Sequence, residues 1–418
     1  MRITADLHIH SRYSRATSRD MQVETLARWA RWKGVTLLGT GDFTHATYLS
    51  ELRAKLEPTG NGLLVPRRGP RDVHFMLTVE ISNVYVQGSR QRRIHTLIFA
   101  PSFEVAARIN QILARHGKLS SDGRPMLGCS ARDLALMVLE VSAECALVPA
   151  HAWTPWYSVF GASSGFDSLE ECYGEAAGAI FAIETGLSSD PPMNWRWSAL
   201  DRISLISNSD AHSPSRIARE GNVFETELSY RAVLDAIRSK DPSRFLYTIE
   251  FFPHEGKYHW DGHRACGILW PPEETRRHGG RCTVCGKPVT VGVMHRVEAL
   301  ADRPDGFIPP GGIPGRNLVP LAEIIAEALG LGVETAAVEN EWKRLIGAGG
   351  TELAILMDLT EAELARFSPP RILEGIRRMR AAQLSITPGF DGVYGKVSLF
   401  GDDSAAPAED SAAQMALF

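Results

Sequence analysis

The stretch RITADLHIH, residues 2–10, carries the pattern that organises much of this chain. It begins with a short strand-like run and ends in two histidines. Successive side chains of a strand point to opposite faces, so His8 and His10, two residues apart, share one face. Apolar runs that lead into a polar end recur in VTLLGTGD (35–42), VHFMLTVEIS (73–82), RIHTLIFAP (93–101), CALVPAHA (145–152), AIFAIETG (179–186) and RISLISNSDAH (202–212).

Helical stretches separate these runs up to about residue 235. One of them, MQVETLARWARWKG (residues 21–34), places apolar residues at helical spacing and stops at Gly34. Alternation of strands and helices predicts a parallel α/β sheet or barrel. In a closed α/β barrel the C-terminal strand ends converge on one site, so we expect the polar ends to meet there.

Length and composition set outer limits on the function. A chain of 418 residues is long enough for two or three units, and 44% hydrophobic with 22% charged residues is an ordinary globular composition. The net charge of −4 does not by itself predict an acidic partner. No apolar run approaches the length of a membrane span, and the first residues lack the apolar stretch of a signal peptide. We therefore expect a cytoplasmic protein with no membrane partner.

The polar strand ends are rich in histidines and carboxylates. They are His8, His10, Asp42, His45, Glu80, His95, His151, Asp210 and His212. A single strand histidine is more often structural, but one H-x-H pair, one D-x-H pair and several further groups are hard to explain in that way. Imidazoles mixed with carboxylates suit zinc, manganese or iron, and so many ligands indicate more than one metal. Paired metals stabilise the attacking and leaving oxygens of phosphoryl transfer, so these residues predict a multinuclear metallohydrolase.

DLHIHS (6–11), the later Glu80, His95 and His151, and SDAH (209–212) resemble the PHP (polymerase and histidinol phosphatase) superfamily over about the first 220 residues. The resemblance implies a distorted (β/α)7 barrel with three metals. It assigns the first metal to His8, His10, Glu80 and Asp210. It assigns the second to Glu80, His95 and His151. Glu80 would bridge the two metals, and Glu80 and Asp210 would be the carboxylates essential for catalysis.

The third metal of that resemblance involves His212 and a group from the second motif. The family usually has TDH there, whereas this chain has TGDFTHATY (40–48). Either Asp42 or His45 could be the ligand, and we favour His45.

After about residue 245 the chain becomes rich in Gly, Pro, His and Cys. Cys282 and Cys285 form a C-x2-C pair, with Cys266 upstream, a pattern typical of a zinc knuckle. His263 is favoured as the fourth ligand by its spacing, with His259 and His295 as rivals. The predicted zinc site is His263, Cys266, Cys282 and Cys285. The remaining cysteines, Cys129, Cys145 and Cys172, are expected to be core thiols.

Four motifs in fixed order extend the resemblance to endonuclease Q along essentially the whole chain. They are KYHWDGHRAC (257–266), CTVCGKP (282–288), VMHRVEALADRP (293–304) and PGFDGVYG (388–395). The resemblance implies an enzyme that cuts DNA on the 5′ side of hypoxanthine, uracil, xanthine or an abasic site and leaves 3′-hydroxyl and 5′-phosphate ends. The expected cofactors are structural Zn2+, and Zn2+, Mg2+ or Mn2+ in the barrel.

These patterns divide the chain into four parts. We expect a barrel over 1–244, a zinc-binding module over 245–300, a mainly helical region over 301–400 and a disordered tail over 401–418. Arginines expected to grip flanking phosphates are Arg68, Arg92 and Arg93. Aromatic residues that would line a nucleotide channel, or else pack the barrel rim, are Trp153, Trp156 and Tyr157. Aromatic residues that would stack on an extruded base, or else pack around the zinc, are Phe251, Phe252, Tyr258, Trp260 and Trp270.

The last residues, QMALF, resemble the short motif by which bacterial proteins bind the DNA polymerase sliding clamp. Gln414 would hydrogen-bond at the pocket rim, while Met415, Leu417 and Phe418 would fill apolar subsites. The acidic, Ala-rich stretch before them would act as a flexible tether.

Two rival functions remain open at this point. One is a PHP-type phosphatase of small molecules, which would need neither the zinc module nor the helical region. The other is a DNA-bound scaffold without catalysis, which the nearly complete ligand set argues against.

Overall fold

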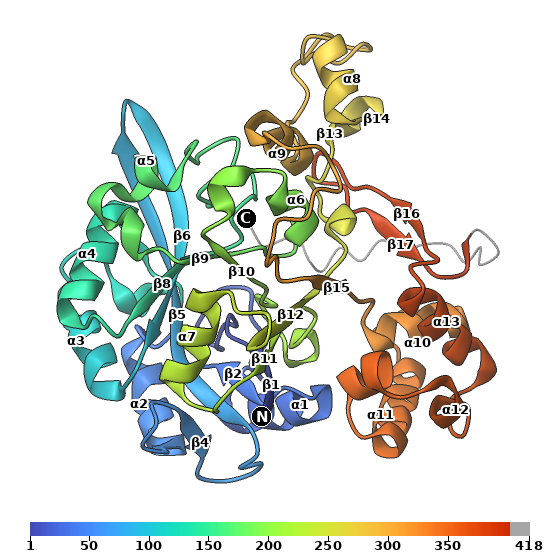
Figure 1. Ribbon diagram of the computed structural model, residues 1–418, viewed down its shortest axis with the longest axis horizontal. Coiled ribbons are helices and arrows are strands. Elements are labelled where there is room, and N and C mark those ends of the chain that lie inside the picture. Colours follow the sequence, from blue (N-terminus) through green and yellow to red (C-terminus); the bar gives the residue numbers. More distant parts are fainter. Residues whose placement is uncertain (402–418) are drawn as a thin grey trace.

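The computed structural model describes residues 1–401, which form a mixed α/β fold (Figure 1). Eleven strands make one sheet, in the order β15-β12-β11-β1-β2-β5-β4-β3, with β6 pairing β5 and β8, and β7 pairing β5. Their bounds are β1 Arg2–Asp6, β2 Leu37–Gly39, β3 Leu56–Pro58, β4 Leu64–Pro66, β5 His74–Gln87, β6 Arg90–Ala100, β7 Met126–Leu127, β8 Ala146–Pro149, β11 Gly221–Glu225, β12 Phe245–Glu250 and β15 Gly315–Asn317.

The strand pairing around β1 sets one direction for the polar ends. β1 is parallel to β2, with Asp6 opposite Leu38, and β2 is parallel to β5, with Leu38 opposite Phe75. All three strands therefore run toward the same edge of the sheet. His8 and Glu80 lie beyond these paired positions, so both reach that edge.

One apolar cluster takes residues from strands that lie all around it. Its members include Ile3 and Ala5 (β1), Leu37 (β2), Met76 (β5), Leu97 and Phe99 (β6), Ala146 and Val148 (β8), Ala182 (β9), Ile206 (β10) and Phe224 (β11). β9 (Ala182–Glu184) and β10 (Ser204–Ile206) form a separate two-stranded sheet. The predicted α/β class is confirmed, but the sheet is mixed and not parallel throughout, because β1–β11, β11–β12, β5–β6 and β6–β8 are antiparallel pairs. The distorted (β/α)7 barrel stays a prediction.

Serine caps begin three of the longer helices, and the predicted glycine stop ends a fourth. Ser102, Ser130 and Ser229 cap α3, α4 and α7 by accepting backbone N–H groups of the first turn. Gly34, with φ of 92°, ends α1 by donating to Ala30 and Arg31 carbonyls, as the predicted stop requires. The helices are α1 Val23–Lys33, α2 Ala46–Lys55, α3 Phe103–Leu113, α4 Ala131–Val141, α5 Leu169–Tyr173, α6 Pro191–Trp195, α7 Tyr230–Ser239, α8 Pro272–Arg277, α9 Val293–Leu300, α10 Leu321–Leu329, α11 Ala336–Gly349, α12 Glu361–Leu364 and α13 Pro370–Arg380.

The predicted boundary at residues 244/245 does not coincide with a structural boundary. β12 (Phe245–Glu250) pairs with β11, and β15 (Gly315–Asn317), from the expected helical region, pairs in parallel with β12. Both strands belong to the large sheet. The composition of the sequence did not indicate that these two strands join the sheet, because the chain leaves the sheet after β12 and returns only for the three residues of β15.

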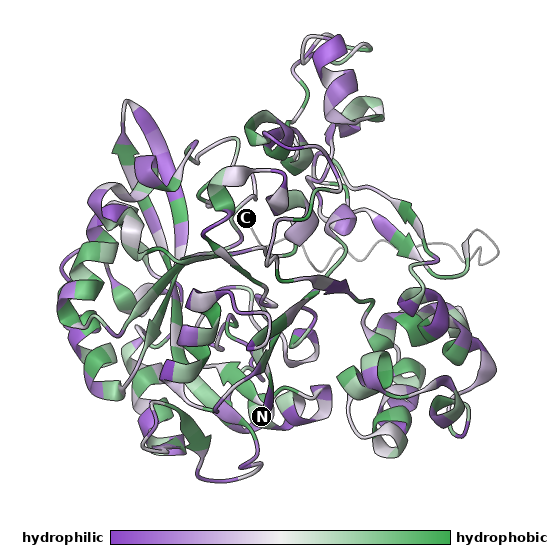
Figure 2. Ribbon diagram, viewed as in Figure 1, coloured by the Kyte–Doolittle hydropathy of each residue, from purple (hydrophilic) through white to green (hydrophobic). Residues whose placement is uncertain are grey.

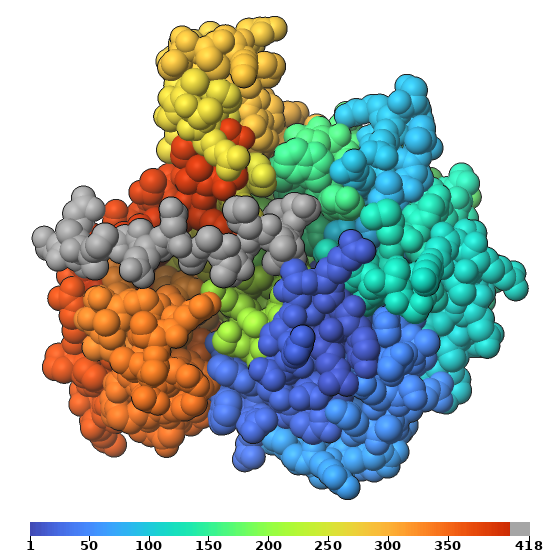
Figure 3. Space-filling model, turned by 180° about the vertical axis from the view of Figure 1, so that it is seen from behind, coloured from blue at the N-terminus to red at the C-terminus, as the bar shows by residue number. Residues whose placement is uncertain are grey.

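The segment between β12 and β15 forms a projecting lobe, seen from behind in yellow in Figure 3. It contains α8, α9 and the hairpin of β13 (Asp261–His263) and β14 (Ile268–Trp270). A further hairpin, β16 (Ser385–Thr387) with β17 (Lys396–Ser398), follows the last helices. Figure 2 shows the central strands as mostly hydrophobic, whereas α8 and the outer part of the β5–β6 hairpin are largely hydrophilic.

The C-terminal helices are joined to α1 by a buried polar contact. Lys33 lies 2.9 Å from the Glu352 carboxylate, which also accepts the Trp342 indole N–H at 2.6 Å. Trp342 stacks on Trp29 at 5.1 Å between ring centroids. Because both charges are buried and paired, removing either side chain by substitution would leave the other charge buried and uncompensated at this contact.

None of the helices in residues 1–401 combines the length and apolar character needed to cross a membrane. The three single cysteines, Cys129, Cys145 and Cys172, are buried, as expected of core thiols.

Candidate metal centre

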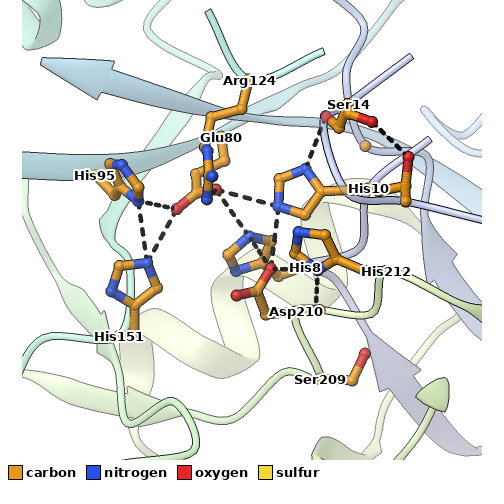
Figure 4. A network of polar contacts seen from close by, with 12 residues as sticks. His8, His10, Ser14, Glu80, His95, Arg124, His151, Ser209, Asp210 and His212 are labelled. Carbon is orange, nitrogen blue, oxygen red and sulfur yellow. Dashed lines mark hydrogen bonds and ion pairs between the residues drawn. The ribbon is translucent and has the colours of Figure 1, made fainter. Parts of the chain in front are cut away.

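Four of the predicted ligands meet in one cluster at the shared strand edge. The ligand atoms of this first cluster lie within 4.8 Å of one another. The cluster is His8, His10, Glu80 and Asp210. The Nε2 atom of His10 is 3.0 Å from Asp210 Oδ1 and 3.2 Å from Glu80 Oε2, and His8 Nε2 is 3.5 Å from each of these oxygens (Figure 4).

The second cluster shares Glu80 with the first. His95 Nδ1 lies 2.6 Å from Glu80 Oε1, and His151 Nε2 lies 3.0 Å from the same oxygen. The two ring nitrogens are 3.2 Å apart. Each oxygen of Glu80 therefore faces a different pair of histidines, which is the arrangement of a carboxylate that bridges two cations (Figure 4).

The first cluster has unsatisfied atoms that fit a cation. His8 Nε2, His10 Nε2 and Asp210 Oδ1 are buried and have no hydrogen-bond partner among the described residues. Buried polar atoms of this kind cost free energy unless something satisfies them. Two imidazole nitrogens and a carboxylate oxygen pointing at one another are the donor set of a transition-metal or manganese site. The residues present therefore fit bound metal.

The second nitrogen of three cluster histidines is held by a neighbour. Glu184 Oε1 and Oε2 lie 3.0 and 3.1 Å from His8 Nδ1, and Asp42 Oδ1 lies 3.1 Å from His10 Nδ1. His151 Nδ1 is 3.1 Å from the Thr154 hydroxyl. A carboxylate on the far nitrogen fixes the proton there and leaves the near nitrogen free for a metal.

Sequence reasoning did not single out Glu184, and it weighed Asp42 only as a ligand. The signal for Glu184 was its place at the end of the run AIFAIETG, which resembles the other strand ends. Asp42 Oδ2 is occupied by the Ser11 amide and hydroxyl, each at 2.6 Å, so both Asp42 oxygens are committed to orienting their neighbours.

Left-handed backbone conformations occur at three non-glycine residues of the site. Asp42, His151 and Asp210 have φ values of 50°, 30° and 46°. Each such residue costs roughly 1–3 kcal/mol, which the surrounding structure must offset. At His151 the amide donates to Glu184 at 2.8 Å, and a Cβ on Gly186 would lie 2.5 Å from the His151 Cβ. In this backbone conformation the His151 amide reaches Glu184 while its ring reaches Glu80.

Burial and neighbouring charges shift the pKa values of Glu80 and His95. Burial raises the pKa of Glu80, but His95 and Arg124 outweigh it and hold that pKa well below the usual range. Burial lowers the pKa of His95 to about 4 despite the nearby Glu80. An ionised carboxylate beside a neutral imidazole is the protonation state in which both can bind a cation.

His45 and His212 belong to neither cluster. His45 caps α2, with Nδ1 accepting from the Tyr48 amide at 3.4 Å, and its ring stacks on Tyr13. His212 Nδ1 donates to the Asp210 carbonyl at 2.9 Å, and its ring lies 4.5 Å from that of His10. The predicted third metal therefore stays a prediction, and the structure gives His45 a capping role.

The predicted zinc ligands lie together in the projecting lobe. His263, Cys266, Cys282 and Cys285 have ligand atoms within 4.8 Å of one another. Burial raises the pKa of the Cys282 thiol, but backbone N–H groups of Cys285 and Val284 outweigh it and lower the pKa to about 7. The rivals for the fourth position lie in other contacts: His259 packs against His254 with the rings tilted, and His295 Nδ1 lies 2.6 Å from Asp261.

Three of the residues predicted to contact DNA lie close to the metal centre or to the projecting lobe. Tyr157 packs on His95 at 4.7 Å between centroids, Arg93 lies over the Tyr157 ring, and Trp156 packs edge-on against Tyr258. These side chains border the metal centre or the adjoining lobe.

Three of the predicted contacts do not fit that role. Trp153 is buried and donates to Asn194 at 2.7 Å, so it is a core residue. Arg92 stacks on Phe166 and bonds the Gly165 carbonyl. Arg68 is exposed in the loop between β4 and β5, before the start of β5, whereas Glu80 lies in the middle of that strand. Sequence could not show this because it does not give the distance between a loop and a site.

Comparisons with known proteins were consistent along the chain. Residues 320–383 match the family model of the MJ0043 C-terminal domain. Protein MJ0043 of Methanocaldococcus jannaschii is 32% identical over 258 residues, which cover 59% of this chain but only 31% of that protein. Protein YqxK of Bacillus subtilis is 27% identical over 414 residues, covering 95% of this chain and 99% of its own.

Among solved structures, the lesion-specific endonuclease Q of Pyrococcus furiosus matches with a TM-score of 0.85 and 32% identity, covering 95% of each chain. The chain belongs to the endonuclease Q family. A second endonuclease Q structure, in complex with a 27-mer duplex that has an abasic lesion at the active site, matches with the same TM-score and identity over 98% of this chain and all of the other. The endonuclease Q resemblance predicted from the four motifs is confirmed.

Proposed function

We propose that this endonuclease Q family member is a metal-dependent DNA repair endonuclease whose reaction centre is the pair of clusters joined by Glu80. The carrying observation is that one buried carboxylate faces two sets of histidines in a chain that matches endonuclease Q over nearly its whole length. The proposed fold around the site is the distorted PHP-type barrel.

The proposed substrates are duplexes with hypoxanthine, uracil, xanthine or an abasic site. Hydrolysis would join a water oxygen to the phosphorus on the 5′ side of the lesion and break the bond from that phosphorus to the 3′ oxygen. A proton from the water ends on the 3′ oxygen, which leaves 3′-hydroxyl and 5′-phosphate ends. Metal ions bound at the two clusters would activate water and stabilise the leaving oxygen.

The protein side chains would position the cations and exclude water from one side of the site. His8, His10 and Asp210 would hold one cation, and His95 and His151 the other, with Glu80 shared between them. Glu184 and Asp42 keep the far nitrogens of His8 and His10 protonated, so the near nitrogens stay available. Tyr157, packed against His95, shields that side of the site from water.

We propose Zn2+ for the His263–Cys285 cluster and Zn2+, Mn2+ or Mg2+ for the Glu80 clusters. The lobe that holds the His263, Cys266, Cys282 and Cys285 cluster has little regular structure beyond a hairpin of two three-residue strands and two short helices. A metal that ties four separate points of such a segment contributes directly to its folding.

The proposed sliding-clamp contact, through Gln414, Met415, Leu417 and Phe418, lies outside the described residues. It is supported by sequence alone, namely the motif and the acidic, Ala-rich stretch that precedes it. Binding of a short peptide that must be ordered would be weak, about micromolar, and tethering would compensate by raising the local enzyme concentration at DNA.

The deciding experiment is a nicking assay. A 5′-labelled duplex with a single abasic site, deoxyuridine or deoxyinosine is incubated with the protein and Mn2+ or Mg2+, with a chelator and an undamaged duplex as controls. A single cut 5′ to the lesion, with ends that a polymerase can extend and a ligase can join, is the expected result. Binding without cutting would support a scaffold, and phosphate release from small esters with intact DNA would support a phosphatase.

A further inference from the structure

Arg124 points into the metal centre although it cannot be a metal ligand. It lies in the loop between the short helical turn Leu119–Ser121 and β7. Its Nη1 atom is 3.1 Å from Glu80 Oε2, the oxygen that also faces His8 and His10 (Figure 4). The sequence pattern gave no reason to choose this arginine from the others.

The loop that carries Arg124 is held by its backbone. Gly123 donates to the Tyr13 carbonyl at 3.0 Å, the Arg124 amide donates to Asp122 at 3.1 Å, and the Ser82 amide donates to Pro125 at 3.1 Å. A Cβ at Gly123 would lie 2.2 Å from Asp42 Oδ2, so the loop sits directly against the site. These bonds fix the loop without help from the guanidinium.

Most N–H groups of the Arg124 guanidinium make no hydrogen bond to the described residues. Among residues 1–401, Glu80 is its only hydrogen-bond partner, and one of its five N–H groups makes that bond. Cations bound at the two clusters would claim the Glu80 oxygens and add positive charge beside Arg124. Those cations would repel the guanidinium, and an anion lying between it and the cations would offset this repulsion.

A phosphodiester at the centre supplies that anion. Its non-bridging oxygens carry the charge of the reacting group, and arginine N–H groups suit them in geometry and charge. Preorganised donors aimed at oxygens that gain charge lower the reaction barrier most.

We propose that Arg124 is a catalytic residue that donates hydrogen bonds to a non-bridging oxygen of the scissile phosphodiester. The proposal rests on the endonuclease function proposed above. The opposite possibility is that Arg124 only neutralises Glu80 when metal is absent. That alternative makes a different prediction, since removing the arginine would then strengthen metal binding and leave the cutting rate unchanged.

The first test compares single-turnover cutting of an abasic duplex by wild type, Arg124→Ala and Arg124→Lys. We expect Arg124→Ala to cut about 10²–10³-fold more slowly, the usual loss for one oxyanion donor, with unchanged metal content and DNA affinity. Arg124→Lys should recover part of the rate because it restores the charge but not the planar fork. Arg15→Ala is the matched control, since Arg15 is exposed and pairs with Asp122 of the same loop.

The second test identifies the oxygen. A methylphosphonate at the scissile position replaces one non-bridging oxygen by a methyl group. If Arg124 contacts that oxygen, one diastereomer should slow wild type strongly but slow Arg124→Ala little further, so that the two losses are not multiplicative. Multiplicative losses for both diastereomers, or wild-type cutting by Arg124→Ala with tighter metal binding, would overturn the proposal. Failure of wild type to cut would instead refute the proposed endonuclease function itself.

Discussion

Glu184→Gln tests whether an outer carboxylate controls the metal centre through a single proton. Glu184 accepts from His8 Nδ1 at 3.0 Å, from the His151 amide at 2.8 Å and from Asn208 at 3.0 Å. It is fully buried, so water cannot replace a lost partner. The substitution keeps the size of the side chain and exchanges one acceptor oxygen for a donor NH2 group.

The exchange should weaken the hold on the Nδ1 proton of His8. Glu184 presents both carboxylate oxygens to Nδ1, at 3.0 and 3.1 Å, whereas glutamine would keep one uncharged acceptor and place a donor NH2 group beside the ring. The Nε2 atom, which points at Asp210 and Glu80, would then be a poorer metal ligand. Loss of such an outer partner typically costs 10–100-fold in metal affinity or activity, which is about 1.4–2.7 kcal/mol. We therefore expect Glu184→Gln to require about 10–100-fold more metal for half-maximal nicking.

The assay is nicking of an abasic duplex at a series of metal concentrations after chelation and dialysis. Because every ligand is retained, a high metal concentration should restore most of the wild-type rate. Glu352→Gln is the control, since Glu352 is also a buried, ion-paired carboxylate but lies at the contact of α1 with the C-terminal helices. An unchanged metal requirement in Glu184→Gln, or the same shift in Glu352→Gln, would refute the reasoning.

The remaining predictions concern the other sites. Glu80→Gln should abolish nicking at any metal concentration, because it removes the carboxylate shared by both clusters; normal cutting with unchanged metal content would contradict the assignment. Cys282→Ser should lose one tightly bound zinc and weaken lesion recognition. In the wild type, zinc affinity should begin to fall as the pH drops below about 7, the pKa of that thiol without metal, because protons then compete for the sulfur; metal analysis after dialysis across pH checks both points. A peptide of residues 404–418 should bind sliding clamp at about micromolar affinity, and the same peptide with Gln414, Leu417 and Phe418 changed to Ala should not; equal binding would give the tail another purpose.

The strand-end pattern predicted one shared site for nine histidines and carboxylates, and the resemblance to the PHP superfamily divided six of them between two clusters. The C-x2-C pair with an upstream cysteine predicted a zinc site, with His263 favoured over His259 and His295 as the fourth ligand. The spacings within these motifs can be read from the sequence without knowing how distant segments pack. The structure accordingly brings together six predicted barrel residues, and His263 joins the three cysteines.

Only the tertiary structure decided what each side chain does within the site. His8 is oriented by Glu184, 176 positions away, and Arg124 reaches Glu80 from a loop with no motif. His45 and Asp42 are three residues apart and were the two candidates for one ligand, with His45 favoured, yet His45 caps a helix and Asp42 holds His10. Such roles depend on which atoms face one another after distant segments pack. Local periodicity specifies the face of a strand, but not the partner that lies opposite it.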